Sequence, residues 1–238
     1  DQELDIKTKQ FNEFKNKFSN KDTNDKIISG MWQLIDNYKI SENIVYDLFD
    51  GIESDLKKEV IIKSKKELLI YSYRVAGTVG LMMAKILDVK KKNSLKAAID
   101  LGIAMQLTNI ARDVVEDSKK NRKYIDSNFE SIKNTLKTAD NFYNSSFSSI
   151  NNISINCRFA ILVARRVYRQ IGNNIMKKKN IENYNNAGKI YVSKFGKFFQ
   201  TTLSIFDLIT LFLFKSENHY REDEHLLINE EINLNERI

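Results

Sequence analysis

Apolar residues recur at spacings of three and four along most of the chain, which is typical of helices that bury one face. In the stretch 26–38 the apolar positions are Ile27, Ile28, Met31, Leu34, Ile35 and Tyr38. The same spacing predicts further helices over residues 42–56, 66–87, 93–120, 127–150, 157–179 and 189–214. Ser41 is the expected N-terminal cap of the 42–56 helix, and Asn93 or Ser94 is the expected N-terminal cap of the 93–120 helix. No segment alternates for long enough to predict a strand, so the pattern predicts an all-α fold.

The predicted helices are too long and too apolar for a small bundle, and they suit a larger bundle that surrounds a cavity. A length of 238 residues is enough for one such domain with a buried core. The chain contains no proline, the main breaker of helix interiors. We expect a single domain over residues 1–214. The remaining residues, 215–238, are charged and lack an apolar face, so we expect a partly disordered tail.

The charge of the chain favours an anionic partner. The formal net charge is +7 and the isoelectric point is near 9.2, which suits nucleic acid, anionic lipid or a phosphorylated substrate. The lysines are dispersed and no motif interleaves aromatic with basic residues, so we do not expect nucleic-acid binding.

The metal-binding residue types are few. Cys157 is the single cysteine, which excludes a multi-cysteine zinc site. His219 and His225 both lie in the charged tail, so no buried histidine-based catalytic set is visible. Metal chemistry in this chain must therefore use oxygen ligands, which favour Mg²⁺, Mn²⁺ or Ca²⁺.

The most apolar segment, residues 198–214, is interrupted by Gln200 and Asp207 and is too short to span a membrane. One interpretation is a buried helix of the domain, and the other is an apolar helix that also rests on a bilayer surface. The opening residues DQELDIKTKQ carry no secretory signal. We therefore expect a cytoplasmic protein, with contact to the inner face of the membrane as the alternative to a freely dissolved one.

Four polar residues share one stripe of the 93–120 helix, because a helix advances about 100° per residue. With Gln106 at zero, Asn109 lies at about −60°, Asp113 at about −20° and Asp117 at about +20°. Oxygen ligands one turn apart suit Mg²⁺, which usually binds through one or two carboxylates plus substrate phosphate oxygens. A solvated helix face would show the same spacing, so the spacing by itself leaves both interpretations open.

Small residues gather in the segment 71–83, where Ala76, Gly77 and Gly80 remove bulk from one helix. Glycine inside a helix costs about 0.5–1 kcal/mol relative to alanine, so its presence calls for a reason. Close packing against another helix and a groove for a long apolar substrate are both consistent with it. Acidic residues on the preceding helix, namely Asp47, Asp50 and Asp55, are most simply solvated.

Together these segments resemble the squalene and phytoene synthase family, the prenyltransferases that join two prenyl diphosphates head to head. YSYRVAGTVGLMM (71–83) resembles the family's Tyr-x-x-x-Val-Ala-Gly-x-Val-Gly helix. QLTNIARDVVEDSKKNRKY (106–124) resembles its second aspartate-rich motif and the Arg-x-Tyr that follows. Weaker similarity covers most of the chain, including residues 139–146 and 158–172. Within the family, the chain looks most like the bacterial phytoene-forming members.

The resemblance implies an all-α isoprenoid (terpenoid) synthase bundle around a central apolar tunnel. Two aspartate-rich motifs then face each other across the tunnel mouth. The implied reaction, a step of carotenoid biosynthesis, joins two geranylgeranyl diphosphates through a cyclopropylcarbinyl diphosphate to give phytoene. It uses Mg²⁺ or Mn²⁺ and no NADPH. Oligomeric state is not implied.

The resemblance also assigns roles to particular residues. The implied Mg²⁺ ligands are Asp113 and Asp117, with Gln106 and Asn109 beside them. The residues implied to contact diphosphate or shield the carbocation are Arg112, Arg122 and Tyr124. The implied tunnel wall consists of Tyr71, Val75, Ala76 and Gly80, and Tyr168 is a further implied contact.

The chain departs from the family pattern at its start. The first aspartate motif, Asp-x-x-x-Asp, is matched in spacing by Asp1 and Asp5, but DQEL fits better the segment that directly follows that motif. The earlier helices of the family are not present in the sequence. We therefore expect an N-terminally incomplete enzyme that holds half of the metal site.

Two alternatives to phytoene formation remain at this point. One is a squalene- or dehydrosqualene-forming enzyme that uses farnesyl diphosphate. The other is a non-catalytic relative that keeps the fold as an assembly or interaction protein. The intact pair Asp113 and Asp117 argues against the second alternative, and the incomplete first motif argues for it.

Overall fold

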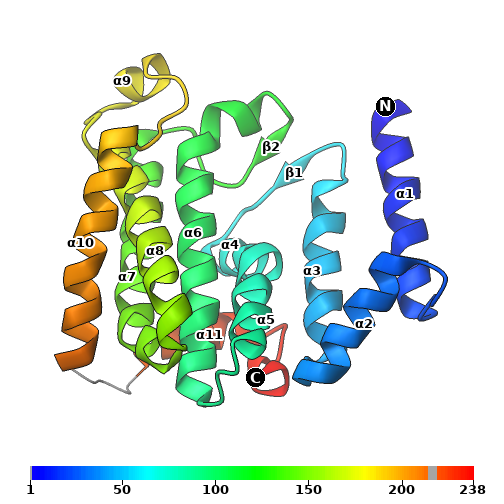
Figure 1. Cartoon of the computed structure of the whole chain (residues 1–238). Helices are drawn as coiled ribbons and strands as arrows, with labels where there is room; N and C mark the ends of the chain where they lie inside the picture. The colour runs from blue at the N-terminus through cyan, green and yellow to red at the C-terminus, as the bar shows by residue number, and fades with distance from the viewer. Residues whose placement is uncertain (1, 214–218) are drawn as a thin grey trace.

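The computed structural model of the chain describes residues 2–213 and 219–238, and its fold is all-α (Figure 1). The longest helix, α6 (Lys92–Ser118), lies at the centre of the bundle. It packs along α7 (Phe129–Phe147) and also contacts α5 (Thr78–Ile86) and α8 (Ile155–Met176). Because α6 has neighbours on several sides, most of its residues between Leu95 and Val114 are buried.

The predicted helix over 66–87 is present in three continuous pieces. They are α4 (Lys65–Ser72), a π-helical turn η1 (Tyr73–Gly77) and α5. Ser64 caps α4 by accepting a hydrogen bond from the Glu67 amide at 3.1 Å. A π turn adds one residue to a helical turn and is frequently found at functional sites. Here it falls within the motif whose side chains were predicted to line the tunnel.

The N-terminal part of the chain forms a layer of three helices. These are α1 (Gln2–Ser19), α2 (Lys26–Tyr38) and α3 (Glu42–Asp55). The α2 helix has the bounds that the apolar spacing predicted. Ser41 occupies the cap position of α3, although its side chain makes no capping hydrogen bond.

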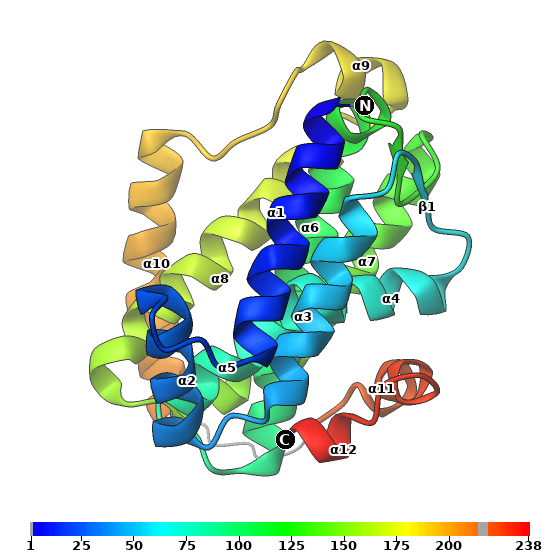
Figure 2. The same ribbon diagram turned by 90° about the vertical axis from the view of Figure 1, so that its right-hand side faces the viewer.

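The helices of the other side follow α6 in the chain. After α7 come the 3₁₀ turn η2 (Ser148–Asn152), α8, the short α9 (Ile181–Asn186) and α10 (Lys194–Leu213). Figure 1 shows α8 and α10 at the left of the molecule and α1 and α3 at the right, and in Figure 2 α1 and α3 lie in front. The N-terminal cap of α6 is Lys91. The predicted caps, Asn93 and Ser94, are wrong, because the helix begins less than one turn earlier than predicted.

Two short strands were not predicted. β1 (Val60–Ile61) and β2 (Arg122–Lys123) run parallel, with Val60 opposite Arg122 and Ile61 opposite Lys123. Each strand has two residues, too few for alternation of apolar and polar positions to be visible. Their pairing joins the end of α3 to the end of α6 (Figure 1).

The structure differs from the expectation of a disordered tail over 215–238. Residues 215–218 lie outside the described residues, but the rest forms α11 (Glu222–Asn229) and α12 (Leu234–Arg237). Ile228, Ile232 and Leu234 are buried in the main core. These apolar residues are too sparse in the sequence to form a visible face, yet they suffice because they fill space that other helices leave open.

The α10 helix is not the buried helix that its apolar sequence suggested. Its inward residues are Gln200, Ser204, Asp207 and Leu211, and Asp207 forms a bidentate ion pair with Arg166 of α8. Its outer face exposes the large apolar side chains of Phe195, Phe198, Phe199, Ile205, Phe206, Ile209, Phe212 and Leu213. The two polar residues that interrupt the apolar run therefore point inward. Among the described residues, no helix has the length and apolar character needed to cross a membrane.

Candidate active site

An apolar cavity of about 390 Å³ lies between α5, α6 and α8. One stripe of α6 lines its length at spacings of three and four, from Ser94 through Ala98, Leu101 and Met105 to Asn109. At about 1.5 Å per residue this stripe is about 22 Å long. A cavity of that length with a mainly apolar lining suits an extended hydrocarbon chain. Six predicted site residues line it: Val75, Ala76, Gly80, Gln106, Asn109 and Tyr168.

Small residues bring the two helices of the cavity wall close together. A Cβ atom at Gly80 would lie 2.2 Å from the carbonyl oxygen of Ala98, and one at Gly102 would lie 2.3 Å from that of Ala76. Both distances are far below contact, so the backbones of α5 and α6 cross at these glycines. Close packing therefore explains Gly80, and the same residue also lines the cavity. The close-packing interpretation is therefore confirmed, and the groove for a long apolar substrate stays a prediction.

The predicted metal-binding carboxylates lie at the C-terminal end of α6, beyond the cavity-lining stripe. Asp113 accepts a bidentate ion pair from Arg112, with Nε–Oδ1 at 2.8 Å and Nη2–Oδ2 at 2.6 Å. The Lys189 ammonium lies 3.4 Å from the same carboxylate. Two cations thus stand beside Asp113 before any metal ion is considered.

Asp117 has a different environment. Among the described residues, none donates a hydrogen bond to its carboxylate. Burial, followed by the negative charge of Asp113, raises the pKa of Asp117 from its ordinary value of 3.8 to about 6. Arg122 and Lys120 partly oppose this shift. A half-buried carboxylate beside a second carboxylate is an arrangement that a divalent cation stabilises.

Asp55 is a site residue that the sequence interpretation missed. Its carboxylate accepts hydrogen bonds from the hydroxyls of Tyr71 at 2.9 Å and Tyr124 at 2.6 Å, and the two rings stack with centroids 4.7 Å apart. Arg122 donates to the backbone oxygen of Asp55 at 2.9 Å. Asp55 therefore joins three predicted residues that come from separate parts of the chain.

Tyr71 and Asp55 lie in environments that differ from those predicted for them. Tyr71 is not among the residues that line the cavity, and its hydroxyl belongs to the polar cluster with Asp55 and Tyr124. Burial raises the pKa of both tyrosines above the ordinary range, so they remain protonated donors. Asp55 is not the solvated acid that its helix position suggested, because β1 and β2 bring Arg122 and Tyr124 next to it.

The α9 helix and the loop that follows it supply further contacts. Tyr184 donates from its hydroxyl to the carbonyl oxygens of Ala111 and Arg112, at 3.0 and 2.7 Å. Lys189, which lies near Asp113, also donates a hydrogen bond to the carboxylate of Glu116 at 2.6 Å. No local pattern in the sequence marks Tyr184 or Lys189, because the residues they contact are more than seventy positions earlier.

The candidate first aspartate motif is not brought to these carboxylates. Asp1 lies outside the described residues. Asp5 is exposed on α1 and lines a surface groove together with Thr8, Lys9 and Asn12 of the same helix. In Figure 1, α3 stands between α1 and α6. The interpretation of Asp5 as the facing half of the metal site is therefore not supported.

The donor set at the end of α6 fits a hard divalent cation. Asp113 and Asp117 offer carboxylate oxygens, and Gln106 and Asn109 offer amide oxygens where the cavity begins. Mg²⁺ prefers oxygen ligands and retains waters, so a site that is open on one side suits it. The raised pKa of Asp117 is the observation of this structure that agrees with such an ion.

An all-α bundle around an apolar cavity, with Asp113 and Asp117 beyond the end of the cavity on the same helix, agrees with the isoprenoid synthase fold. The family model of squalene/phytoene synthase matches residues 2–128. The chain therefore belongs to the squalene/phytoene synthase family.

Curated relatives agree with this assignment. The chain is 33% identical over 154 residues to "Phytoene synthase" of Pseudescherichia vulneris, an alignment that covers 56% of this chain and 50% of the relative. It is 33% identical over 153 residues to "15-cis-phytoene synthase" of Enterobacter agglomerans, with 56% and 52% covered. The chain thus spans about half the length of the curated relatives it matches.

A solved structure confirms the fold. The crystal structure of a dehydrosqualene synthase in complex with ligand superposes with a TM-score of 0.64 at 25% sequence identity. The match covers 87% of this chain and 78% of that chain. The all-α isoprenoid synthase architecture predicted from the sequence is confirmed.

Proposed function

We propose that this chain belongs to an enzyme that condenses two geranylgeranyl diphosphates head to head to form phytoene. The observation that carries the proposal is the apolar cavity along α6, which begins at Gln106 and Asn109, one turn before Asp113. A substrate with a diphosphate head and a long hydrocarbon tail has its polar and apolar parts in the same order as the site. The phytoene-forming relatives support this choice of substrate.

The polar end of the site would bind the diphosphate. Asp113 and Asp117 would hold Mg²⁺, which when bound neutralises charge on the leaving diphosphate. Arg112 and Arg122 supply fixed positive charge close to the same position, and such charge favours the ionised state over the intact ester. Arg112 is itself oriented by its ion pair with Asp113, which also raises the pKa of Arg112 and keeps it charged.

The apolar part of the site would control the carbocation. Val75, Ala76 and Met105 line the cavity and exclude water, the nucleophile that would otherwise capture the cation. Tyr168 presents an aromatic ring to the cavity, which attracts positive charge. No reductant is required for phytoene, in contrast to a product that is completed by hydride transfer.

The proposal is tested by incubating the purified protein with geranylgeranyl diphosphate and Mg²⁺. The assay is run on this chain and on a form extended by any coding sequence that precedes Asp1. We expect phytoene from at least the extended form. The absence of phytoene and of a cyclopropyl intermediate from both forms would rule the proposal out. That result would favour the non-catalytic alternative, in which the protein keeps the fold and acts in assembly or interaction.

The two carboxylates are tested separately in the active form. Asp113→Asn and Asp117→Asn should each lower kcat by several orders of magnitude with unchanged circular dichroism, because each removes a metal ligand. Asp126→Asn is the matched control, since Asp126 is an exposed acid of the loop after β2 that pairs only with Lys123. Full activity in both ligand variants would refute the metal assignment.

A farnesyl diphosphate substrate is the second candidate, favoured by the similarity to a dehydrosqualene synthase structure. An assay with equal amounts of farnesyl and geranylgeranyl diphosphate separates the two, because the hydrocarbon products differ in chain length. A predominant thirty-carbon product would replace the first proposal with this one.

We also propose that the protein is cytoplasmic and contacts the inner face of the membrane through α10. The helix exposes a row of phenylalanines, and Lys194 and Lys197 lie on the same helix. Apolar side chains beside lysines suit an interface with anionic lipid. Sedimentation with anionic vesicles should be lost in a Phe198→Ser/Phe206→Ser variant, whereas Thr202→Ser should bind normally. Equal sedimentation of the two variants would contradict the proposal.

A further inference from the structure

A second group of metal-ligand side chains lies far from Asp113. Asp100, in the first half of α6, is fully buried, and two histidines of the C-terminal segment contact it. His219 places Nε2 at 2.8 Å from Oδ2 of Asp100, and His225 places Nε2 at 2.7 Å from Oδ1. The side chains of the two histidines are 1% and 2% exposed. The sequence placed both histidines in a charged tail and did not predict that their side chains are buried.

The three residues offer the ligands of a transition-metal site. One nitrogen from each imidazole and one carboxylate oxygen all lie within 4.8 Å of one another. Imidazole together with carboxylate suits Zn²⁺ and its first-row neighbours rather than Mg²⁺. Three protein ligands leave one position of a tetrahedral ion for water. We propose that Asp100, His219 and His225 bind a divalent transition-metal ion of the zinc type.

Two of the three residues, Asp100 and His219, have further polar partners arranged as in the outer shell of a metal site, whereas Nδ1 of His225 is buried without a hydrogen-bond partner among the described residues. Ser145 of α7 donates to Oδ2 of Asp100 at 2.5 Å, which orients the carboxylate. Nδ1 of His219 lies 3.2 Å from Oε1 of Glu222, so a carboxylate stands behind the imidazole. In metal sites, the histidine ring commonly donates its second N–H to such a carboxylate, which leaves the other nitrogen free to bind the ion.

Charge balance also calls for a cation at this position. Asp100 is fully buried, and Glu222, an exposed carboxylate that also pairs with Lys96 at 3.2 Å, approaches the same histidine from the other side. A neutral imidazole carries one N–H, so one of the two nitrogens of His219 faces a carboxylate without a proton between them. A proton or a metal ion must fill that gap. Two imidazoles converge on the two oxygens of a single carboxylate, and this set of groups also matches the ligands of a divalent ion.

The proposed site is independent of the site for prenyl diphosphate. Asp100 lies thirteen residues before Asp113 on α6, which is about 20 Å along the helix. Its ligands include nitrogen, whereas the donors near Asp113 are oxygens. The proposed ion would fasten the segment 219–225 to α6, because Asp100 belongs to α6, His225 belongs to α11 and His219 lies just before α11. Ser145 of α7 supports Asp100 from a third helix. The role of the ion is therefore structural, and it does not depend on the proposed reaction.

The experiment is a titration of untagged protein with Co²⁺, followed by displacement with Zn²⁺. The chain has only two histidines and one cysteine, so an affinity tag must be removed and little background remains. We expect visible ligand-field absorption that saturates at one Co²⁺ per chain and disappears with one Zn²⁺. Zn²⁺ should also raise the melting temperature, because an ion that binds only the folded state stabilises it.

Variants assign the signal to the three residues. His219→Gln and His225→Gln keep an amide donor toward Asp100 but remove the metal-binding nitrogen. We expect each to weaken binding by more than the roughly 10–100-fold that loss of an outer-shell partner costs. Ser145→Ala should weaken binding within that range. Circular dichroism of the glutamine variants reports whether they are folded.

Two controls separate this site from others. Cys157→Ser should leave the Co²⁺ spectrum unchanged, and so should the double variant Asp113→Asn/Asp117→Asn. The proposal is overturned if the parent protein shows no stoichiometric Co²⁺ absorption. It is equally overturned if the His219→Gln/His225→Gln variant retains the absorption; in either case the cluster is a hydrogen-bond network only.

Discussion

Asp55 illustrates how a single carboxylate can organise a site without lining its cavity. It accepts the hydroxyls of Tyr71 and Tyr124 and also fixes Arg122 through its backbone oxygen. All three partners were predicted from motifs at residues 71–83 and 106–124. Asp55 itself precedes both motifs and belongs to neither. Its position follows from the pairing of β1 with β2.

We predict that Asp55→Asn weakens the polar end of the site. An amide retains one acceptor oxygen but loses the charge, so one of the two buried tyrosine hydroxyls loses its partner. The free energy of unfolding should fall by about 1–3 kcal/mol, the cost of an unsatisfied buried group. Chemical denaturation measures it. Asp50→Asn on the same helix is the control, because Asp50 is half-exposed. Its ion pair with Arg74 is a long contact of 3.6 Å.

A second prediction at this scale concerns the pH dependence of Asp117. Its pKa in the folded protein is raised to about 6, whereas the unfolded chain has the ordinary value near 3.8. The folded protein therefore takes up a proton at a pH at which the unfolded chain is still ionised. Without metal, this group's contribution to the free energy of unfolding should increase as pH falls from about 7 to about 4.

The measurement compares unfolding of the parent and Asp117→Asn in EDTA across that range. The difference in the free energy of unfolding between them should shrink as Asp117 becomes neutral in the parent. Excess Mg²⁺ should reduce the pH dependence of the parent, since it favours the ionised carboxylate. A difference that stays constant with pH would mean that the pKa of Asp117 is not raised.

At the scale of elements, the crossing of α5 and α6 determines the wall of the cavity. Gly80 meets the carbonyl of Ala98, and Gly102 meets that of Ala76. The π turn that precedes α5 contains Val75 and Ala76, which line the cavity, whereas Tyr71 lies before the turn and does not line it. The motif of small residues therefore acts on two helices at once.

We predict that Gly80→Ala and Gly102→Ala each destabilise the protein. A methyl group at either position has to displace backbone atoms. We expect this to lower the free energy of unfolding by about 1–3 kcal/mol at each site. Thermal unfolding measures the change. Gly30→Ala is the matched control, because Gly30 also lies inside a helix but a Cβ there meets nothing within 4 Å. The control should be stabilised by about 0.5–1 kcal/mol. Equal effects at the three positions would contradict the crossing.

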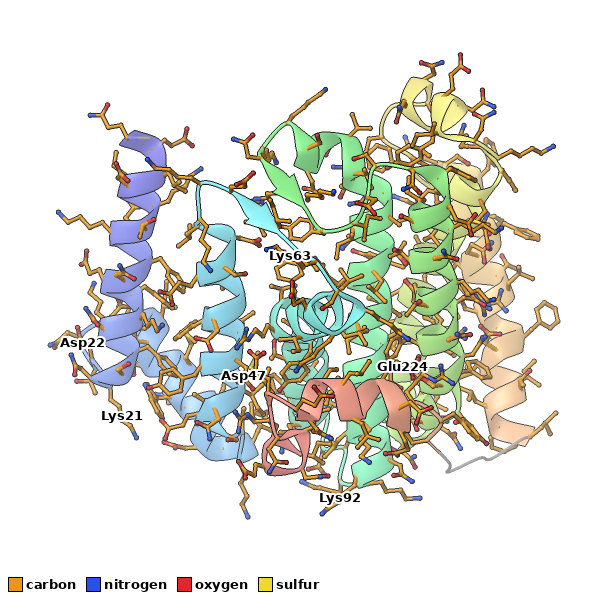
Figure 3. All side chains as sticks on the ribbon, turned by 180° about the vertical axis from the view of Figure 1, so that it is seen from behind. Lys21, Asp22, Asp47, Lys63, Lys92 and Glu224 are labelled. Carbon is orange, nitrogen blue, oxygen red and sulfur yellow. The ribbon has the colours of Figure 1, made fainter. Side chains whose placement is uncertain are left out.

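At the scale of the whole molecule, the C-terminal segment holds distant parts of the chain together. Arg237 pairs with the buried Asp47 of α3 through Nε at 2.8 Å, and Tyr73 donates to the same carboxylate at 3.0 Å. Figure 3 shows Asp47 beside this segment, on which Glu224 is labelled. The segment thus contacts α3 and η1 at one end and α6 at the other, through His225 and Asp100.

We predict that Arg237→Ala destabilises the protein by about 3–5 kcal/mol, because it leaves the buried carboxylate of Asp47 without its cation. Tyr73 alone does not neutralise that charge. Removal of the opposing carboxylate as well, in Arg237→Ala/Asp47→Asn, should recover part of the loss. Urea denaturation of the single and double variants measures both effects.

Glu230→Gln serves as the control for that prediction. Glu230 pairs with Lys66 at 2.6 Å, but both side chains are substantially exposed. Such pairs contribute about 0–1 kcal/mol. If Arg237→Ala were no more destabilising than Glu230→Gln, the C-terminal segment would not fasten α3 as described.

The sequence by itself determined the helical class, the bounds of α2 and the positions of the two motifs. Helical periodicity and the polar stripe of α6 are local properties, and a local pattern is sufficient to predict them. The segment 71–83 also predicted the cavity wall, because small residues at helical spacing act wherever another helix approaches. The stripe from Gln106 to Asp117 needed only the geometry of one helix.

Only the tertiary structure decided which residues meet across the chain. Asp47, Asp55 and Asp100 have the sequence pattern of solvated or incidental acids, yet each is half-buried or buried against partners from distant segments. The charged tail is ordered because Ile228 and Leu234 enter a core that other helices build. The apolar α10 is exposed for the converse reason, since its polar residues find partners on α8. A carboxylate, a histidine or a phenylalanine has no fixed environment in the sequence, and its neighbours in space determine its protonation, its burial and its role.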